Sequence, residues 1–174
     1  MNELIQRMLR KIAYFAPGGD SLRPALHKLR GVTIGNNVWI SQYVYIDEIH
    51  PECITIEDNS SIGIGVLIIS HLYWGKRKSD FVSKTHIGKN VFIGPYSIIL
   101  PNVAIGDGSV VQAGTVVSRD VPPQTLWGIP KARAVAKITV PLTFETSFDG
   151  FLKGLRPFVN DDQEESDNGL KDAA

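Results

Sequence analysis

The side chains best suited to acid–base chemistry in this sequence are its four histidines and the acids that lie near them. Histidine is the natural base near neutral pH, because its reference pKa is about 6.5. His71 lies in the run IISHLY, directly before a long polar segment, and Asp47 and Glu48 lie in the earlier run YVYIDEIH. A base histidine needs a partner that fixes its tautomer. We therefore predict that Asp47 or Glu48 orients His71 or binds a substrate hydroxyl, with a solvated turn as the alternative.

The other three histidines and the single cysteine are weaker candidates for a catalytic role. His50 and His86 are expected at the surface or in packing, with the lining of a substrate site as the alternative, and His27 is expected to be structural. Because Cys53 is the only cysteine, no intrachain disulfide can form, which is typical of a reducing compartment.

An aromatic residue and a group of cations follow His71 in the polar segment LYWGKRKSDFVSKTH. Trp74 precedes Lys76, Arg77 and Lys78. An aromatic platform with cations suits a sugar or nucleotide-sugar ligand, and a solvated loop is an equally good interpretation.

A repeat of six residues must position these side chains, because it dominates the middle of the chain. Twelve units each begin with Ile or Val, and the leads are Ile34, Ile40, Ile46, Ile56, Ile62, Ile68, Ile87, Ile93, Ile99, Ile105, Val111 and Val117. A period of six is neither a helical period nor a plain alternation. It suits a short strand whose β-branched lead points inward, followed by a corner. Three units make one triangular coil, so we predict an all-β fold, a parallel β-helix of about four coils.

The corners and the interruptions of the repeat mark where the chain turns and where it leaves the coils. Corners demand a positive φ, which suits Gly, Asn or Asp, and the non-glycine corner candidates are Asn37, Asn59, Asn90, Asn102 and Asp107. Between Ile46 and Ile56 four residues are inserted, and between Ile68 and Ile87 thirteen are inserted. The longer insertion is where we expect function, because the repeat does not require it.

The two ends of the chain differ from the repeat. Residues 1–30 form an N-terminal helical segment, in which residues 3–15 place Ile5, Met8, Leu9, Ile12 and Phe15 on one helical stripe. We expect this helix to cap the first coil; contact with a membrane surface is the second-ranked alternative, because the polar face is basic. The solenoid domain spans residues 31–138. The extension 139–174 has apolar side chains to cover the open end or a neighbouring subunit, and an acidic tail from about residue 161 that we expect to be disordered.

Charge and hydropathy exclude several classes of protein. The formal net charge is zero, which offers no argument for nucleic acid as a partner. No apolar run approaches the roughly 20 residues of a membrane span, and the N-terminus lacks the uninterrupted apolar region of a signal peptide. A cytoplasmic location is therefore expected.

The repeat, the histidine in its sixth unit, the ejected loop and the closing run IGPYSIILPNVAIGDGSVVQAGTVVSRDVPPQTLWGIP together resemble the hexapeptide acyltransferase family over roughly residues 30–138. Within that family the sequence is most similar to galactoside, maltose and polysaccharide O-acetyltransferases. The resemblance implies a left-handed β-helix, an exception to the right-handed crossover rule. It also implies a homotrimer with active sites between subunits, acetyl-CoA as co-substrate, and a saccharide hydroxyl as acceptor, as in polysaccharide biosynthesis.

Acyl transfer from a thioester to a hydroxyl needs a base, donors for the developing oxyanion and a groove for the pantetheine arm. The resemblance implies that His71 is the general base of a direct transfer. It also implies that an acid at Asp47 or Glu48 contacts the acceptor. Ser41 stands where related enzymes carry an acceptor-binding Asn, and Trp74 would contribute to the same acceptor site.

The resemblance also matches a coenzyme groove to the last coil and the segment after it. Ala113, Gly114, Ser118 and Arg119 correspond to the family's coenzyme contacts. The ending GIPKARAVAK, with Lys131 inserted, would bring Arg133 and Lys137 to the phosphates, and exposed charge is the alternative. Pro95 replaces a Ser of that groove and offers no N–H there.

Three other functions stay open from the sequence. The acceptor could be the amine of an amino sugar or of a nucleotide-linked amino sugar. The zinc carbonic-anhydrase branch of the same fold needs two histidines five residues apart, whereas His50, His71 and His86 are 21 and 15 residues apart, so no metal is expected. A non-enzymatic scaffold is the third alternative. No family motif brings Cys53 near His71, so a covalent relay is not expected.

Overall fold

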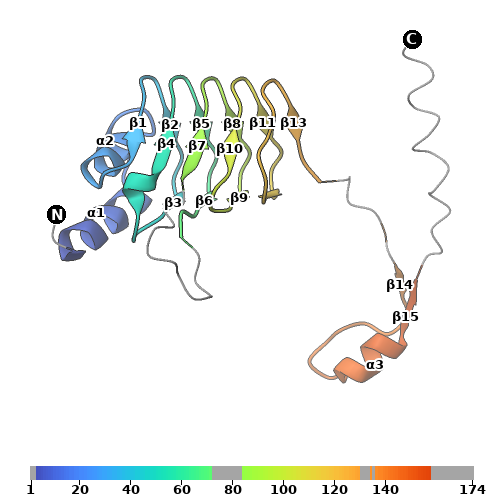
Figure 1. The fold of residues 1–174 in the computed structure, drawn as a ribbon. Helices are drawn as coiled ribbons and strands as arrows, with labels where there is room; N and C mark the ends of the chain where they lie inside the picture. The colour runs from blue at the N-terminus through green and yellow to red at the C-terminus, as the bar shows by residue number, and fades with distance from the viewer. Residues whose placement is uncertain (1–2, 72–83, 130–133, 135, 158–174) are drawn as a thin grey trace, which may run out of the picture. The chain divides into compact units, whose positions relative to one another are not determined.

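The computed structural model describes residues 3–71, 84–129, 134 and 136–157 of the 174-residue chain (Figure 1). The chain divides into two compact units, Met1–Ile129 and Pro130–Ala174. Each unit is described by itself below.

The first unit is a left-handed parallel β-helix in which three short strands make each coil. Sheet A contains β1, β4, β7 and β10, sheet B contains β2, β5, β8, β11 and β13, and sheet C contains β3, β6, β9 and β12. The strands are β1 Thr33–Ile34, β2 Trp39–Ile40, β3 Tyr45–Ile46, β4 Ile54–Ile56, β5 Ser61–Ile62, β6 Leu67–Ile68, β7 Thr85–Ile87, β8 Phe92–Ile93, β9 Ile98–Ile99, β10 Ala104–Ile105, β11 Val110–Val111, β12 Val116–Val117 and β13 Leu126–Trp127. The four predicted coils are confirmed, and β13 extends sheet B beyond them.

The leads of the repeat form the core, as the six-residue period predicts. In sheet B, Ile40 pairs with Ile62, Ile62 with Ile93, and Ile93 with Val111, and all four are fully buried. Sheets A and C have the same parallel register at their own leads. Each coil therefore buries its β-branched side chains against the next coil, and a nearest-neighbour stack supplies the stability.

Four of the five predicted non-glycine corner residues have a left-handed backbone conformation. Asn37, Asn59, Asn90 and Asn102 have φ values between 53° and 62°. The prediction for Asp107 is wrong, because Gly108 takes the left-handed conformation with φ 69°. Asp107 instead accepts the backbone N–H of Lys89 through Oδ1 at 2.9 Å, which ties two coils together.

Glycine directly after a lead serves a different purpose from the corner residues. A Cβ atom on Gly63 would lie 2.7 Å from the carbonyl oxygen of Ile93 and from the nitrogen of Pro95. Neighbouring coils approach so closely there that no larger residue fits without a shift of the backbone.

Two helices, α1 Glu3–Phe15 and α2 Leu22–Leu29, lie at the N-terminal end of the solenoid (Figure 1). The sequence predicts α1 but not α2, because Gly18 and Gly19 mark only a break and α2 is just eight residues long. Arg23 of α2 is buried and donates to the carbonyl oxygens of Ile40 at 2.6 Å and Ala16 at 2.5 Å, so it joins the helices to the first coil.

Helix α1 packs on a different face from the predicted one. Ala13 is buried and packs with Ala16, Leu26 and the half-buried Leu9. Of the other members of the predicted stripe, Ile5, Met8 and Ile12 face away from the packed side and are 47–54% exposed. Phe15 is 66% exposed, and its ring contacts the ring of Tyr43 in the first coil, with the centroids 5.8 Å apart. Among the described residues, no helix is long and apolar enough to cross a membrane.

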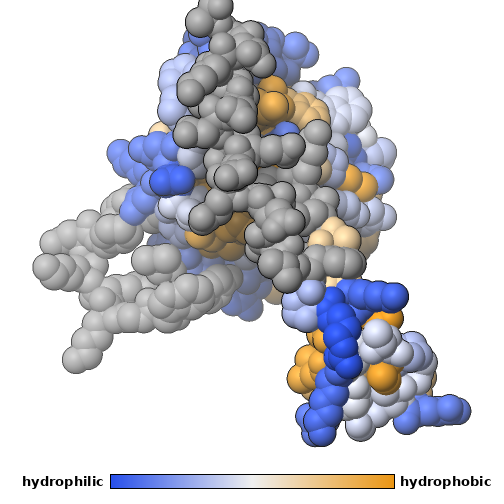
Figure 2. Space-filling model, turned by 90° about the vertical axis from the view of Figure 1, so that its right-hand side faces the viewer, coloured by the Kyte–Doolittle hydropathy of each residue, from blue (hydrophilic) through white to orange (hydrophobic). Residues whose placement is uncertain are grey.

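The second unit contains a small hairpin and one short helix. Strands β14 Ala136–Ile138 and β15 Leu155–Pro157 pair antiparallel, and α3 Phe148–Lys153 lies between them in sequence. Ser147 caps α3 by accepting the N–H of Gly150 at 3.1 Å. Apolar side chains such as Phe144 and Phe148 are exposed on this unit, and Figure 2 shows the apolar surface there. The tail predicted to be disordered, from about residue 161, lies outside the described residues.

Candidate functional site

The candidate site lies at two stacked corners of neighbouring coils. Asp47 follows β3 and His71 follows β6, and these strands are adjacent in sheet C. Both residues therefore lie at the corner between sheets C and A, called the C–A corner below. The four-residue insertion after Ile46 forms a single turn of 3₁₀ helix, η1 Pro51–Cys53, beside them.

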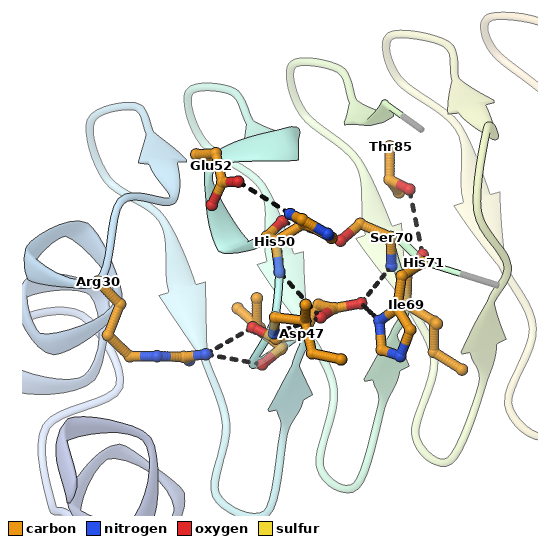
Figure 3. A network of polar contacts seen from close by, with 10 residues as sticks. Arg30, Asp47, His50, Glu52, Ile69, Ser70, His71 and Thr85 are labelled. Atoms are coloured by element: carbon orange, nitrogen blue, oxygen red, sulfur yellow. Dashed lines mark hydrogen bonds and ion pairs between the residues drawn. The ribbon is translucent and has the colours of Figure 1, made fainter. Parts of the chain in front are cut away.

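A buried contact joins the two side chains. Nδ1 of His71 is hydrogen-bonded to Oδ2 of Asp47 (Figure 3). His71 is only 5% exposed, and Asp47 is fully buried. A carboxylate at Nδ1 holds the neutral ring in the tautomer whose proton is on Nδ1, which leaves the basic lone pair on Nε2.

The Asp47 carboxylate is held by main-chain donors as well as by the histidine. Oδ2 accepts the N–H of Ser70 at 2.7 Å, and Oδ1 accepts the N–H groups of Ile49 at 2.8 Å and His50 at 3.3 Å. Burial alone raises the pKa of this carboxyl, but the donors from Ser70, Ile49, His71 and His50 together hold its pKa below the ordinary value. Asp47 is therefore an anion at neutral pH and can stabilise a charged His71.

Two further hydrogen bonds order the backbone on either side of the pair. The Ser70 hydroxyl donates to the carbonyl oxygen of His50 at 2.9 Å, and the buried Thr85 hydroxyl donates to that of Ile69 at 3.3 Å. Figure 3 shows that these residues surround the Asp47–His71 contact. No signal in the sequence singled out Ser70 or Thr85 for this purpose.

Behind Asp47 lies a buried arginine that the sequence analysis missed. Nη2 of Arg30 donates to the carbonyl oxygens of Ile46 at 3.1 Å and Asp47 at 2.5 Å, and Nη1 contacts Nδ1 of His27 at 2.9 Å. Burial lowers the pKa of Arg30 to about 10, which leaves it cationic at neutral pH. Burial and the Arg30 cation lower the pKa of His27 to about 3, so His27 is neutral and accepts from Arg30. The guanidinium fixes the main chain from which the Asp47 side chain departs.

Of the two predicted acids, only Asp47 contacts His71. Glu48 instead pairs with Arg10 of α1 at 3.0 Å, and the Arg10 guanidinium lies 5.4 Å from the centroid of the Tyr45 ring. The side chains of adjacent residues in an extended backbone point to opposite sides, so the two acids have different surroundings.

The remaining candidates for chemistry lie in other environments. His50 pairs with Glu52 at 3.1 Å through an exposed side chain, and His86 pairs with Glu57 at 3.4 Å on sheet A. For Cys53, burial and then the charges of Glu52 and Asp47 raise the pKa, so the group stays a thiol at neutral pH. Such a thiol is a poor nucleophile.

The residues predicted to bind a coenzyme occupy two corners of the last coil. Ser118 and Arg119 follow β12, so they lie at the C–A corner two coils beyond His71, a separation of about 10 Å along the solenoid. Ala113 and Gly114 lie between β11 and β12, at the corner between sheets B and C, called the B–C corner below. All four are exposed, and the Gly114 N–H donates to the carbonyl oxygen of Pro95 at 2.9 Å. The guanidinium of Arg119 lies 5.4 Å from the Trp127 ring centroid.

Ser41 lies at the B–C corner of the first coil, away from His71 in the same chain. Its hydroxyl accepts from the Trp39 indole at 3.0 Å. It lines an open cavity of about 540 Å³ with residues that include Asp20, Arg23, Trp39 and Gln42. One chain therefore does not bring Ser41 and His71 together.

Three further predicted contact residues lie outside the described part of the first unit. Trp74, with the neighbouring cations of its loop, and Arg133 lie outside the described residues. Lys137 is exposed on β14 of the second unit, where it pairs across the hairpin with Arg156. Among the residues that the structure describes, no three His, Cys, Asp or Glu side chains gather as a metal site would require.

Known proteins share both the sequence pattern and the fold. A family profile described as "Bacterial transferase hexapeptide (six repeats)" matches residues 84–119. A protein of Schizosaccharomyces pombe, whose name assigns it provisionally to the acetyltransferases, is 37% identical over 145 residues, which cover 78% of this chain and 70% of that protein. A similarly named protein of Bacillus subtilis is 39% identical over 89 residues, and the match covers 51% of each sequence. The chain thus spans about half the length of the Bacillus relative.

Among solved structures, this chain is similar to a hexapeptide-repeat-containing acetyltransferase from Vibrio cholerae that was crystallised with acetyl-coenzyme A. The TM-score is 0.56 at 25% sequence identity, and the match covers 72% of this chain and 81% of the other.

Proposed function

Since the chain belongs to the hexapeptide-repeat transferase family, we propose that it moves an acetyl group from acetyl-CoA to a hydroxyl of a saccharide or saccharide-containing acceptor. The observation that carries this proposal is the buried contact between the Asp47 carboxylate and Nδ1 of His71. Acetyl-CoA bound to the Vibrio cholerae structure supports the choice of donor.

His71 acts as the general base in this proposal. Its Nε2 takes the proton of the acceptor hydroxyl while the hydroxyl oxygen attacks the thioester carbonyl carbon. The new carbon–oxygen bond replaces the carbon–sulfur bond, and the proton passes from His71 to the departing coenzyme A thiolate. Asp47 stays ionised throughout and stabilises the imidazolium that forms between the two proton transfers. No covalent enzyme intermediate is needed, which agrees with the raised pKa of Cys53.

The coenzyme would lie along the corners of the later coils. Ala113 and Gly114 offer main-chain groups, and Ser118 and Arg119 lie on the same corner as His71, within the reach of a pantetheine arm. Arg133 and Lys137 would pair with its phosphates, since cations are the usual partners of phosphate oxygens. The adenine end of the donor would thus lie toward the C-terminal end of the solenoid.

A homotrimer completes the proposed site. Ser41 and Ala113 lie at the B–C corner, whereas His71 and Ser118 lie at the C–A corner. Two different corners can line one site only if they come from different copies, and three copies close a ring around a triangular solenoid. Ser41 of one copy and Trp74 would then contact the acceptor above His71 of the next. The enzyme would work in the cytoplasm, in agreement with a single cysteine that can form no intrachain disulfide.

The direct test incubates the full chain with acetyl-CoA and a panel of neutral sugars, oligosaccharides and amino sugars, and measures the release of free thiol. His71→Ala should lower kcat on the best acceptor by roughly a thousandfold, because general-base catalysis typically contributes factors of that order. Asp47→Asn should lower kcat by a comparable factor, since an amide can hold the ring in the wrong tautomer. Transfer to amines alone would change the acceptor class to N-acetylation.

A matched histidine variant separates catalysis from damage to the fold. His86→Ala removes an exposed histidine from sheet A and should keep kcat within about threefold, as surface substitutions usually do. Thiol release by His71→Ala at the parental rate on a good acceptor would disprove the assigned base. A stoichiometric zinc ion with carbon dioxide hydration would favour the carbonic-anhydrase alternative.

A further inference from the structure

We propose that the open cavity beside Trp39 binds one neutral pyranose unit of the acceptor, with the apolar face of the sugar on Trp39 and its hydroxyls at Asp20 and Gln42. The cavity is called the Trp39 cavity below. The inference deepens the proposed function and rests on it for the reaction of the sugar, whereas the binding step can be measured without acetyl-CoA.

The Trp39 cavity has the size and the walls of a site for a small molecule. It holds about 540 Å³, within the range of roughly 300–1,000 Å³ that is usual for such sites. One wall comes from the turn at residues 17–20, which precedes α2, and the other from Trp39, Ser41 and Gln42 of the first coil. An aromatic surface with a few polar groups around it is the usual lining of a ligand site.

The Trp39 ring is held in place before any ligand arrives. Its Nε1 donates to the hydroxyl oxygen of Ser41 at 3.0 Å, and a Cβ atom on Gly19 would lie 2.7 Å from Cε2 of the ring. The main chain at Gly19 is fixed in turn, because its carbonyl oxygen accepts the N–H of Ile40 in β2 at 2.8 Å. A ring that is already ordered lowers the entropy that binding must overcome.

The exposed part of Trp39 suits the apolar face of a sugar ring. Trp39 is 47% exposed although it lines a concave surface. The face of an aromatic ring is electrically negative. The C–H groups on one face of a pyranose are weakly positive and apolar, so this face can stack on the indole while the hydroxyls point to the sides.

Polar groups lie where those hydroxyls need partners. Asp20 and Gln42 are exposed at the cavity. The Asp20 carboxylate accepts hydrogen bonds, whereas the Gln42 amide both donates and accepts. Ser41 accepts from Trp39 and has a hydroxyl proton that it can donate. Sugar hydroxyls donate and accept as well, so this mixed set matches them better than it matches a ligand that only accepts.

The charges of the cavity favour a neutral sugar. Among the described residues that line it, Asp20 and Arg23 carry opposite charges. Arg23 is buried and donates to the carbonyl oxygens of Ile40 and Ala16, which holds the cation in the wall. Burial lowers the pKa of Arg23 and the Asp20 charge raises it, so the two groups interact. An anionic ligand would meet Asp20 and an ammonium group would meet Arg23, which argues for a hydroxyl sugar over an amino sugar.

The test measures binding of methyl α-D-glucopyranoside, methyl β-D-galactopyranoside and D-glucosamine to the full chain without acetyl-CoA. Saturation-transfer difference NMR follows the protons of each sugar and gives its dissociation constant. At least one methyl glycoside should bind saturably, and D-glucosamine should bind no more tightly. Trp39→Ala should weaken the binding at least about tenfold, because the stacking surface is lost. Asp20→Asn should weaken it by about tenfold or more, because hydrogen bonds to a charged acceptor are lost.

Matched variants separate stacking from damage to the fold. Trp39→Phe keeps an aromatic face and should bind within about fivefold of the parent chain. Phe92→Ala removes another half-exposed aromatic ring of sheet B, and Asp149→Asn removes an exposed acid of the second unit. Neither of these two substitutions touches the Trp39 cavity, so both should leave sugar binding unchanged. Circular dichroism checks that every variant is folded.

Kinetics with acetyl-CoA keep this proposal apart from the proposed function. On the best sugar acceptor, Trp39→Ala should raise the KM for the sugar about tenfold or more and leave the KM for acetyl-CoA within about twofold. Sugar binding that depends on Trp39 and Asp20, without thiol release on any acceptor, would overturn the proposed function and keep the cavity. Thiol release with an unchanged KM for the sugar in Trp39→Ala would do the reverse.

Three binding results would overturn the proposal. One is that neither methyl glycoside binds saturably. Another is equal affinity in the parent chain, Trp39→Ala and Asp20→Asn. The third is a preference of more than about tenfold for D-glucosamine, which would show that the cavity selects a cation. Loss of binding in Trp39→Ala and Asp20→Asn, with binding retained in Trp39→Phe and in both controls, is the result that supports it.

Discussion

At the scale of single residues, burial at the N-terminal end of the solenoid determines the charge states of Arg30 and His27. Arg30 is buried and cationic, and it contacts two carbonyl oxygens and the neutral ring of His27. A buried cation is costly unless its donors find acceptors. Neutral His27 therefore stabilises Arg30 as an acceptor, whereas protonated His27 would repel it and destabilise the fold. The pair therefore makes stability sensitive to acid.

The pKa of His27 predicts the pH window of that sensitivity. In the folded chain the pKa is about 3, below the reference value of about 6.5, so the unfolded state binds the extra proton between these values. Stability is full above about pH 6.5 and falls on acidification toward pH 3, by up to about 1.4 kcal/mol per pH unit. Urea unfolding of the wild type and of His27→Gln, which keeps an acceptor for Arg30, should show this slope only in the wild type.

A control histidine isolates the effect. His86 is 45% exposed at its side chain, so His86→Gln should keep the wild-type slope. Equal slopes in the wild type and in His27→Gln would mean that other groups, such as the acids, cause the acid sensitivity.

At the scale of the element, each strand places the side chain of its lead in the stack of buried leads, called the ladder here. The side chain of the residue before the lead points outward. In β8, Ile93 is fully buried between Ile62 and Val111, whereas Phe92 is 46% exposed. The ladder has close packing on both sides, so a cavity there cannot collapse easily.

The strand β8 allows a matched comparison of the two faces. Ile93→Ala should lower the free energy of unfolding by about 3–4 kcal/mol, because it removes buried methyl groups and leaves a cavity. Phe92→Ala, one residue away, should cost about 1 kcal/mol or less, since much of its ring already faces water. Chemical denaturation of both variants measures the difference. Equal costs would contradict the inward direction of the leads.

At the scale of the whole molecule, the chain keeps its core and its proposed phosphate contacts in different units. Every fully buried apolar side chain of the described residues lies between Ala13 and Val121. Lys137 lies in the second unit, Pro130–Ala174, to which Arg133 also belongs by sequence. Folding and coenzyme affinity should therefore be separable.

Removal of residues 130–174 tests this separation. The shortened chain should unfold within about 1 kcal/mol of the full chain, because it retains both apolar clusters. Its KM for acetyl-CoA should rise roughly tenfold or more, because charge-assisted contacts to the phosphates are lost. The double variant Arg133→Gln with Lys137→Gln in the full chain should reproduce the change in KM. An unchanged KM in both would show that neither cation meets the coenzyme.

The sequence alone determined the solenoid and the position of the histidine along it. Leads such as Ile62 and Ile93 recur at a strict period, and each coil packs only on its neighbours, so a local pattern was enough to predict four coils. His71 stood out because the regular pattern stops directly after it. The corner at Asp107 was off by one residue, since Gly108 provides the same freedom of φ at lower cost.

Only the tertiary structure decided which side chains meet. Asp47 and Glu48 are neighbours of the same chemical type, and the turn of the chain at one corner gives the first to His71 and the second to Arg10. Arg30 reaches Asp47 across 17 residues, and no periodic pattern encodes such a contact. The outward direction of Ile5, Met8 and Ile12 likewise depends on how α2 packs beside α1. The period records which residues are buried in the coils, whereas contacts between coils and helices depend on distances that exist only after the chain has folded.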